Sequence, residues 1–252
     1  MAEFQMKIAG TVAAVTSLFD STPHYFRAYL SGETPDFSVA VSTEDLIFEQ
    51  AKLDQEAQEE GFRRRIFTDP FLERAAIQRA FAEYLFDRDT LLLHSSAIML
   101  DGRAYLFVAK SGTGKSTHTR LWCQAFGDRA VMINDDKPFV RLSSAGVEVF
   151  GSPWSGKHGL DANLSAPLAG ICLLERGAED HIQPIDPQQA LPMLRKQAYL
   201  PQDPEKTAYF HRMTLQLAEM VPLWRMTCTK DPQAAYVAHN AMSVGWRSEN
   251  IR

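Results

Sequence analysis

The chain has 252 residues, of which 45% are hydrophobic and 23% charged, and its formal net charge is −5. These values are typical of a globular protein with one large domain, or with one domain and a small appendage. A negative charge without Lys/Arg-rich blocks argues against nucleic acid as the main partner. The widely spaced Cys123, Cys172 and Cys228 indicate reduced thiols instead of a disulfide framework or a zinc site.

The apolar segments are all short. None approaches the roughly 18 residues of a membrane span, and the N-terminus lacks a signal-peptide pattern. The sequence therefore predicts a cytoplasmic protein with no membrane partner.

The N-terminal region has the composition of a small sheet followed by helices. Residues 6–18 are β-prone, and residues 25–30 and 37–41 alternate between apolar and polar, with turn compositions between them. We expect these runs to form a small antiparallel sheet. Ser42 then begins a helix, with the polar residues up to Gly61 as its body or extension.

Asp69-Pro70 is a clear helix start, since proline is well tolerated in the first turn. Apolar residues recur every three or four positions over residues 70–86, which predicts an amphipathic helix with one buried face. We interpret residues 1–90 as an accessory α+β region and residues 91–252 as the core.

Two apolar runs, residues 92–100 and 104–108, flank Asp101-Gly102. This dipeptide is strongly favoured in two-residue hairpin turns. The strand over residues 104–108 should therefore pair antiparallel with the strand before it, in contrast to the mainly parallel sheets of most P-loop proteins.

The loop that follows this hairpin carries a phosphate-binding pattern. Gly112 and Gly114 allow backbone conformations that a Cβ would hinder, and the loop N–H groups and the next helix N-terminus would point at phosphates. Lys115 would place a positive charge at the β- and γ-phosphates, and Ser116 would bind Mg²⁺. A chance Gly/Ser turn is the alternative, and Ala109 departs from G-x-x-x-x-G-K-[ST]. The residues expected at the nucleotide are Lys110, Ser111, Gly112, Thr113, Gly114, Lys115, Ser116 and Thr117.

A carboxylate pair, Asp135 and Asp136, directly follows the apolar run 130–133. Carboxylates at the end of a buried strand lie where a sheet opens onto its ligand. Such a pair suits both Mg²⁺ coordination and acceptance of a proton from an attacking hydroxyl. A surface turn is the alternative, but the position after an apolar strand favours a functional site.

The next strand, residues 147–150, leads into the loop GSPWSGKHG over residues 151–159. Trp154 could form a wall of the site, and Lys157 and His158 could contact phosphate or the acceptor. A further strand, residues 170–174, ends at Glu175, which is either an extra Mg²⁺ ligand or part of a strand-end salt bridge.

The C-terminal part shows no distinct chemistry. We expect helices from Asp186 toward Tyr199 and over residues 204–219 and 232–242, with a strand over residues 222–228. Core packing is the default role for these elements.

Several of these features occur together in a fixed order: His94 in LHSSA, the Asp101-Gly102 turn, SGTGKS and INDDK. This assembly resembles the kinase core of bacterial HPr kinase/phosphorylase and its relatives, whose fold is similar to that of phosphoenolpyruvate carboxykinase. The resemblance covers residues 92–177. The segment before INDDK is slightly longer than in the family, the signature after it is not recognisable, and the N-terminal region differs. The chain thus resembles an unassigned member, not HPr kinase itself.

Carried over residue by residue, the resemblance implies that Lys115 and Ser116 hold the nucleotide and Mg²⁺. It implies that Asp135 is the general base, that Asp136 is its acidic partner at the metal, and that His94 orients or polarises the site.

The expected fold is α/β (α+β), a mixed-sheet P-loop kinase core with a small N-terminal α+β region. The expected activity is ATP- and Mg²⁺-dependent transfer of a γ-phosphoryl group to a hydroxyl of an unidentified protein, peptide or small molecule. Two alternatives stay open: an ATPase or nucleotide switch without a dedicated acceptor, and a carboxykinase-type enzyme, which the missing second metal-ligand set disfavours. A homo-oligomer is compatible with the sequence, which carries no signal of oligomeric state.

Overall fold

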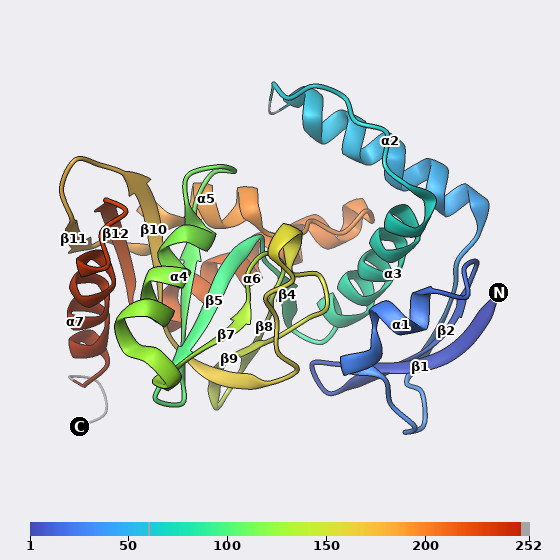
Figure 1. Ribbon diagram of the computed structural model, residues 1–252, viewed down its shortest axis with the longest axis horizontal. Coiled ribbons are helices and arrows are strands. Elements are labelled where there is room, and N and C mark those ends of the chain that lie inside the picture. Colours follow the sequence, from blue (N-terminus) through green and yellow to red (C-terminus); the bar gives the residue numbers. More distant parts are fainter. Residues whose placement is uncertain (60, 248–252) are drawn as a thin grey trace. The chain divides into compact units, whose positions relative to one another are not determined.

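The computed structural model describes residues 1–59 and 61–247, and the chain divides into two compact units, Met1–Leu85 and Phe86–Arg252 (Figure 1). Each unit is a mixture of helices and strands with a sheet of its own. Within the described residues, no helix combines the length and the apolarity needed to cross a membrane.

The first unit begins with a hairpin and continues through helices. Its elements are β1 (Ala2–Ile8), β2 (Thr11–Ser17), α1 (Thr22–Tyr25), a 3-10 turn (Arg27–Tyr29), β3 (Phe37–Ala40), α2 (Thr43–Glu59) and α3 (Asp69–Phe86), of which α3 ends at the first residue of the second unit.

The first sheet has the order β1-β2-β3. Ala9 and Gly10 close the β1–β2 hairpin with φ values of 49° and 74°, as a tight turn between antiparallel strands requires. The predicted antiparallel sheet is confirmed for this pair and wrong for β2 and β3, which are parallel. Antiparallel pairing is excluded because α1 and the 3-10 turn carry the chain back to the starting end of β2 before β3 begins.

The strand expected over residues 25–30 is also wrong. Pro23 lies in the first turn of α1, and the buried residues that follow are Phe26 and Tyr29, three positions apart. A spacing of three suits a helical turn and not a strand, in which side chains alternate. Leu30 alone makes an isolated bridge, to Met6.

The helices predicted to begin near residues 43 and 70 are confirmed as α2 and α3. Two charged side chains of α3, Glu73 and Arg79, make polar contacts within the unit. The fully buried Glu73 of α3 accepts hydrogen bonds from the Leu18 amide and the Thr22 hydroxyl. Arg79 of α3 pairs with Asp45 and Glu49 of α2 at 2.6 Å each.

The second unit contains the remaining elements. They are β4 (Thr90–Leu92), β5 (Ser95–Leu100), β6 (Arg103–Val108), α4 (Lys115–Phe126), β7 (Ala130–Asn134), β8 (Phe139–Ser143), β9 (Gly146–Phe150), β10 (Ser165–Arg176), β11 (His181–Pro184), α5 (Pro187–Gln197), α6 (Thr207–Met220), β12 (Leu223–Cys228) and α7 (Gln233–Arg247), with 3-10 turns at Gly127–Arg129, Gly156–His158 and Pro204–Lys206.

The second sheet is mixed and, within the described residues, has nine strands, with the path β4-β8-β9-β10-β6-β5-β7 and with β12 joining β10 to β11. The predicted Asp101-Gly102 hairpin is confirmed, since both residues have positive φ values, 50° and 78°, and β5 pairs antiparallel with β6. On its other side β6 is parallel to β10. Strands β8 and β11 were not predicted, and the single strand expected over residues 92–100 is interrupted between β4 and β5.

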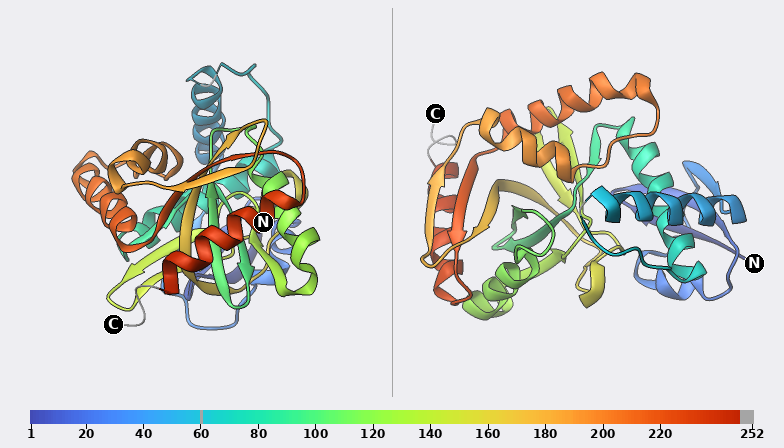
Figure 2. Two further views of the ribbon diagram at one scale, coloured as in Figure 1. Left: turned by 90° about the vertical axis from the view of Figure 1, so that its left-hand side faces the viewer. Right: turned by 90° about the horizontal axis from the view of Figure 1, so that it is seen from above.

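The two faces of this sheet are covered by different helix pairs, as the right-hand view of Figure 2 shows. The side chains of β6 belong alternately to the cores on the two faces of the sheet. Leu106 and Val108 belong to the core cluster that contains residues of α5 and α6, whereas Tyr105 and Phe107 belong to the cluster with residues of α4 and α7. Burial on both faces explains why β6 reads as a continuous apolar run.

The strand directions bring the polar loops to one edge of the sheet. Strands β6, β7 and β10 end at the same edge, where the antiparallel β5 begins. The phosphate-loop sequence, the carboxylate pair and His94 therefore meet there, although 40 positions separate His94 from Asn134 at the end of β7 in the numbering.

Candidate functional site

The loop between β6 and α4 has the backbone that its glycines predict. Gly112 and Gly114 have φ values of 75° and 125°, which side-chain-bearing residues rarely adopt. Ala109 stands where the pattern has glycine, but its φ is not positive and its side chain is fully buried. A glycine is therefore not required at position 109, and the departure from the pattern leaves the loop shape unaffected.

The start of α4 is suited to an anion. Its N-cap is Gly114, no side chain caps the helix, and no acidic residue lies in its first turn. The first amides of the helix and the positive end of its dipole are thus not satisfied by a local side chain. The other loop residues, Lys110, Ser111, Thr113, Ser116 and Thr117, are exposed or half-buried.

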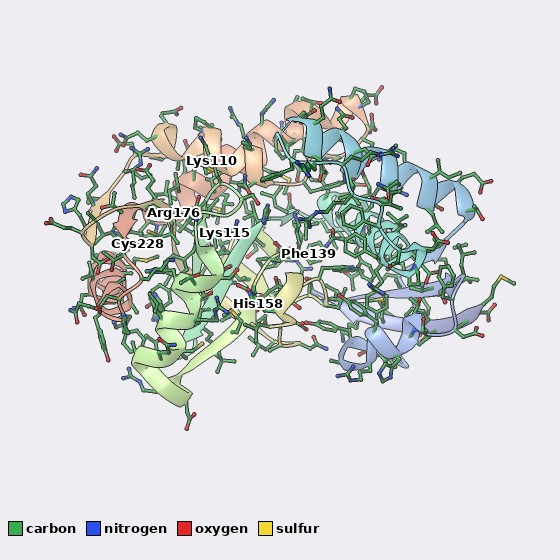
Figure 3. The ribbon with its side chains drawn as sticks, turned by 45° about the horizontal axis from the view of Figure 1, so that its top comes forward. Lys110, Lys115, Phe139, His158, Arg176 and Cys228 are labelled. Atoms are coloured by element: carbon green, nitrogen blue, oxygen red, sulfur yellow. The ribbon has the colours of Figure 1, made fainter. Side chains whose placement is uncertain are left out.

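Lys115 folds back over the loop. Its side chain is buried, and Nζ lies 3.3 Å from both the Ala109 carbonyl oxygen and Nε2 of His94. Figure 3 labels Lys115 at the start of α4. The positive charge of Lys115 therefore lies beside the loop and not at the end of an extended, solvated side chain.

His94 lies immediately before β5, where its amide donates to the Gln197 carbonyl over 2.8 Å. Its Nε2 is 3.1 Å from Oδ1 of Asp136. Burial lowers the pKa of His94, and the nearby charges of Lys137 and Lys115 lower it further, while the Asp136 carboxylate acts in the opposite direction. The imidazole is therefore neutral near pH 7 and can orient its neighbours without adding charge.

Asp135 is almost fully buried beside two hydroxyl groups. Ser96 Oγ donates to Oδ1 of Asp135 over 3.0 Å, and the hydroxyl of Ser116 lies near enough to this carboxylate to affect its pKa. Burial raises the pKa of Asp135, and the hydroxyls of Ser96 and Ser116 oppose that change. The carboxylate thus lies near the hydroxyl that the sequence predicts as a Mg²⁺ ligand.

Asp136 has different neighbours. Burial alone would raise its pKa, but the hydrogen bond from His94 and the charges of Lys137 and Lys115 lower it below the ordinary value. Its side chain is 31% exposed. Asp136 is therefore an ionised carboxylate that solvent can reach, in contrast to the more enclosed Asp135.

Asn134 and Ser152, which were not predicted as site residues, shape the turn that carries the carboxylates. The Oδ1 atom of Asn134 accepts from the amides of Asp136 at 2.8 Å and Lys137 at 2.6 Å. Its Nδ2 donates to the Ser152 carbonyl over 2.7 Å. An Asn that binds the amides two and three residues ahead is typical of Asx turns, and this signal could have been read from INDDK.

The loop over residues 151–159 lies against the carboxylate turn. Trp154 is buried and its ring is 6.4 Å from that of Phe139, so it packs beneath the loop. His158 is exposed, and its charge lowers the pKa of Asp135. A Cβ on Gly156 would be 3.2 Å from the Asp136 Cβ. The side chain of Lys157 lies outside the described part of the structure.

The last two residues of β10, Glu175 and Arg176, lie at the same edge of the sheet as the phosphate-binding loop. Glu175, considered as an extra Mg²⁺ ligand, has its carboxylate 3.5 Å from Nε of Arg225, which agrees with the salt-bridge alternative. Arg176, which the sequence analysis did not single out, donates to the backbone carbonyls of Gly112 and Thr113. The strand-end arginine therefore contacts the phosphate-loop sequence directly.

The residues present fit a Mg²⁺ ion that is bound mainly through a nucleotide. Within residues 1–59 and 61–247, no group of three or more His, Cys, Asp or Glu side chains could hold a metal ion unaided. Mg²⁺ commonly uses one or two protein ligands together with substrate phosphates and water. The adjacent Ser116 hydroxyl and Asp135 carboxylate meet that smaller requirement.

No family model matches the sequence, and no curated protein matches it either. Among solved structures, the chain is similar to the Hpr(Ser) kinase/phosphatase from Coxiella burnetii, with a TM-score of 0.32 and 12% sequence identity. The match covers 63% of this chain and 96% of that one. A TM-score of 0.32 is too low for this similarity to assign a function to the chain.

Proposed function

We propose that this protein is a Mg²⁺- and ATP-dependent phosphotransferase with a hydroxyl acceptor. The observation that carries the proposal is the meeting of a lysine, a neutral imidazole and two unlike carboxylates at the helix N-terminus that follows a Gly-rich loop. Phosphoryl transfer needs positioning and charge neutralisation more than covalent chemistry, and these groups supply both. The resemblance of the motifs to an HPr kinase core is compatible with a serine hydroxyl as acceptor.

The nucleotide would bind with its phosphates in the loop. The positive φ values of Gly112 and Gly114 support a backbone that can direct amides at an anion, and α4 offers an uncapped N-terminus. Lys115 would leave the Ala109 carbonyl for the phosphates. When bound, Mg²⁺ would neutralise phosphate charge, with Ser116 as a protein ligand.

The surroundings of the two carboxylates favour a division of roles opposite to the one that the resemblance implies. Asp135 lies near Ser116, so we assign Asp135 to the metal side. Asp136 is partly exposed and next to His94, so we assign it to the acceptor side. A general base must be ionised and within reach of the hydroxyl proton, and Asp136 is the more accessible of the two.

The proposed reaction can be written for these residues. The acceptor oxygen attacks the γ-phosphorus of ATP, the bond between that phosphorus and the β,γ-bridging oxygen breaks, and ADP leaves. The acceptor proton passes to the carboxylate of Asp136. His94 keeps that carboxylate oriented through the 3.1 Å contact, and Lys115 stabilises the charge that gathers on the leaving phosphate.

The test has two stages. Calorimetric titration of Mg·ATP into the full-length protein measures binding, and incubation with γ-labelled ATP and cell extract, followed by mass spectrometry, identifies a phosphorylated acceptor. Label on a protein, peptide or small molecule supports the proposal. Release of phosphate to water alone, with no labelled acceptor, would favour the ATPase or switch. Absence of Mg·ATP binding would reject both.

A further inference from the structure

Arg176, the last residue of β10, joins the strand end to the loop before α4. Its Nε donates to the Thr113 carbonyl over 3.1 Å, and its Nη2 donates to the Gly112 carbonyl. The two bonds use neighbouring N–H groups on one edge of the planar guanidinium, a fork that lysine cannot reproduce. Two successive peptide groups of the loop are therefore held by a single side chain.

These bonds constrain the direction of the following amides. The described peptides are all trans, and in a planar trans peptide the N–H points opposite to the C=O. Because Arg176 holds the carbonyls of Gly112 and Thr113, the N–H groups of Thr113 and Gly114 point away from the guanidinium. The Thr113 N–H agrees with this geometry, since it donates across the turn to the Lys110 carbonyl over 3.2 Å.

The charge of Arg176 adds to this arrangement. Among the described residues, the ion pairs do not include Arg176, whereas its neighbour Glu175 pairs with Arg225. The guanidinium therefore brings a positive charge to the loop that no carboxylate within 4 Å offsets. Lys110, Lys115 and Arg176 lie around the same loop (Figure 3).

We infer that Arg176 is a positioning residue that holds the Gly112–Gly114 backbone in a phosphate-accepting conformation before any ligand arrives. The inference rests on the proposed function for the identity of the ligand, a nucleoside triphosphate. Arg176 acts through the loop carbonyls and not by touching the reacting atoms. Without its fork, a segment with two glycines would sample many backbone conformations, and binding would have to select one of them.

The experiment compares wild type with Arg176→Ala, Arg176→Lys and Arg176→Gln in the full-length protein. Lys230→Ala is the matched control, since Lys230 is an exposed cation just beyond Cys228, the β12 residue paired with Arg176. Backbone ¹⁵N relaxation of residues 112–114 measures loop order without ligand. Calorimetry then measures the Kd of Mg·ATP and of pyrophosphate.

We expect Arg176→Ala to lower loop order and to raise the Kd of Mg·ATP about tenfold, as the loss of hydrogen bonds to a charged group implies. Arg176→Lys keeps the charge without the fork, so it should recover only part of the affinity. Lys230→Ala should match wild type in both measurements. Arg176→Gln removes the charge but keeps an amide N–H donor. It replaces Arg176→Ala in both measurements if Arg176→Ala does not fold.

Unchanged loop order in the Arg176 variants would overturn the inference, and so would lowered order with an unchanged Kd. Full recovery by Arg176→Lys would also overturn it, because charge and not the fork would then be responsible. If wild type binds neither Mg·ATP nor pyrophosphate, the proposed function fails and the phosphate-binding part of the inference with it. The relaxation data would still decide, by themselves, whether Arg176 orders the loop.

Discussion

Nζ of Lys115 lies 3.3 Å from Nε2 of His94, and the same ring nitrogen lies 3.1 Å from Oδ1 of Asp136. One nitrogen cannot accept from the lysine and donate to the carboxylate at once. A proton on Nε2 favours the contact with Asp136, whereas a proton on Nδ1 leaves Nε2 to accept from Lys115. His94 therefore links the loop lysine to the carboxylate turn through the tautomer it adopts.

Removal of the Lys115 ammonium should abolish most nucleotide affinity. Lys115→Ala deletes the charge that would meet the β- and γ-phosphates, and charge-assisted contacts of this kind are the strong ones. We expect the Kd of Mg·ATP to rise at least about 100-fold, as the loss of roughly 3 kcal/mol for such a contact implies. Calorimetry checks the affinity, with Lys230→Ala as a control for loss of an exposed positive charge. Equal affinities of Lys115→Ala and wild type would remove the central element of the proposed site.

The two carboxylates can be separated by conservative amide substitutions. If Asp136 accepts the proton, Asp136→Asn should lower turnover by ~10²–10⁴-fold, the usual range for a general base, with little change in Mg·ATP affinity. Asp135→Asn should instead raise the Mg²⁺ concentration needed for half-maximal activity. Steady-state rates across a Mg²⁺ series measure both effects. The reverse pattern would restore the assignment that the resemblance implies, and no effect of either change would make the pair structural.

Gly151 should be intolerant of any side chain. A Cβ there would be 1.9 Å from the Ala162 carbonyl oxygen and 3.0 Å from that of Ile133, both backbone atoms that cannot move independently. Gly151→Ala should lower the free energy of unfolding by about 1–3 kcal/mol, the usual cost of overpacking. Urea denaturation measures it. Gly32→Ala is the matched control, because nothing lies within 4 Å of its Cβ and its φ is not positive. Equal losses in both variants would contradict the predicted clash.

Stability should fall in mild acid because of His118. Burial lowers the pKa of this residue from 6.5 to about 4. Its Nε2 accepts from Trp122 Nε1 over 3.2 Å, and its Nδ1 is buried without a hydrogen-bond partner in the described structure. Between these two pKa values the unfolded chain binds a proton that the folded chain does not. The free energy of unfolding should therefore drop by about 1.4 kcal/mol per pH unit, roughly 3 kcal/mol in all.

The measurement is urea denaturation at pH 7.5, 6 and 5 for wild type, His118→Gln and His24→Gln. The loss toward low pH should be smaller in His118→Gln, since glutamine can still accept from Trp122 but binds no proton. His24 is exposed, so its variant should follow wild type. Parallel curves for all three proteins would show that His118 does not contribute.

The second unit should fold and bind nucleotide without the first, provided that the shortened chain begins at Phe86. Phe86 packs edge-on against Tyr209 at 5.4 Å, Asp87 pairs with Lys206 at 2.6 Å, and the Asp89 carbonyl accepts from the Leu142 amide over 2.9 Å. A chain beginning at Phe86 should therefore keep Mg·ATP binding, and one beginning at Leu91 should be less stable. Thermal melting and calorimetry compare the two. Loss of binding in both would mean that the first unit is needed for the site.

Much of the site could be predicted from local sequence. Gly112 and Gly114 indicated a loop with positive φ, the Asp101-Gly102 turn indicated the antiparallel β5–β6 pair, and an apolar run placed Asp135 at a strand end. Each of these inferences depends on neighbours along the chain, where backbone sterics and turn geometry act without help from the rest of the fold.

The tertiary structure decided which of these parts touch. The contact of Ser96 with Asp135, the bond of Arg176 to the loop carbonyls and the separate partners of Asp135 and Asp136 join residues far apart in the chain. Strand order creates such neighbours, and no periodicity in the sequence encodes strand order. The failure at residues 25–30 also involves distant residues, because the fully buried Phe26 stacks on Phe4 of β1 with ring centroids 6.0 Å apart.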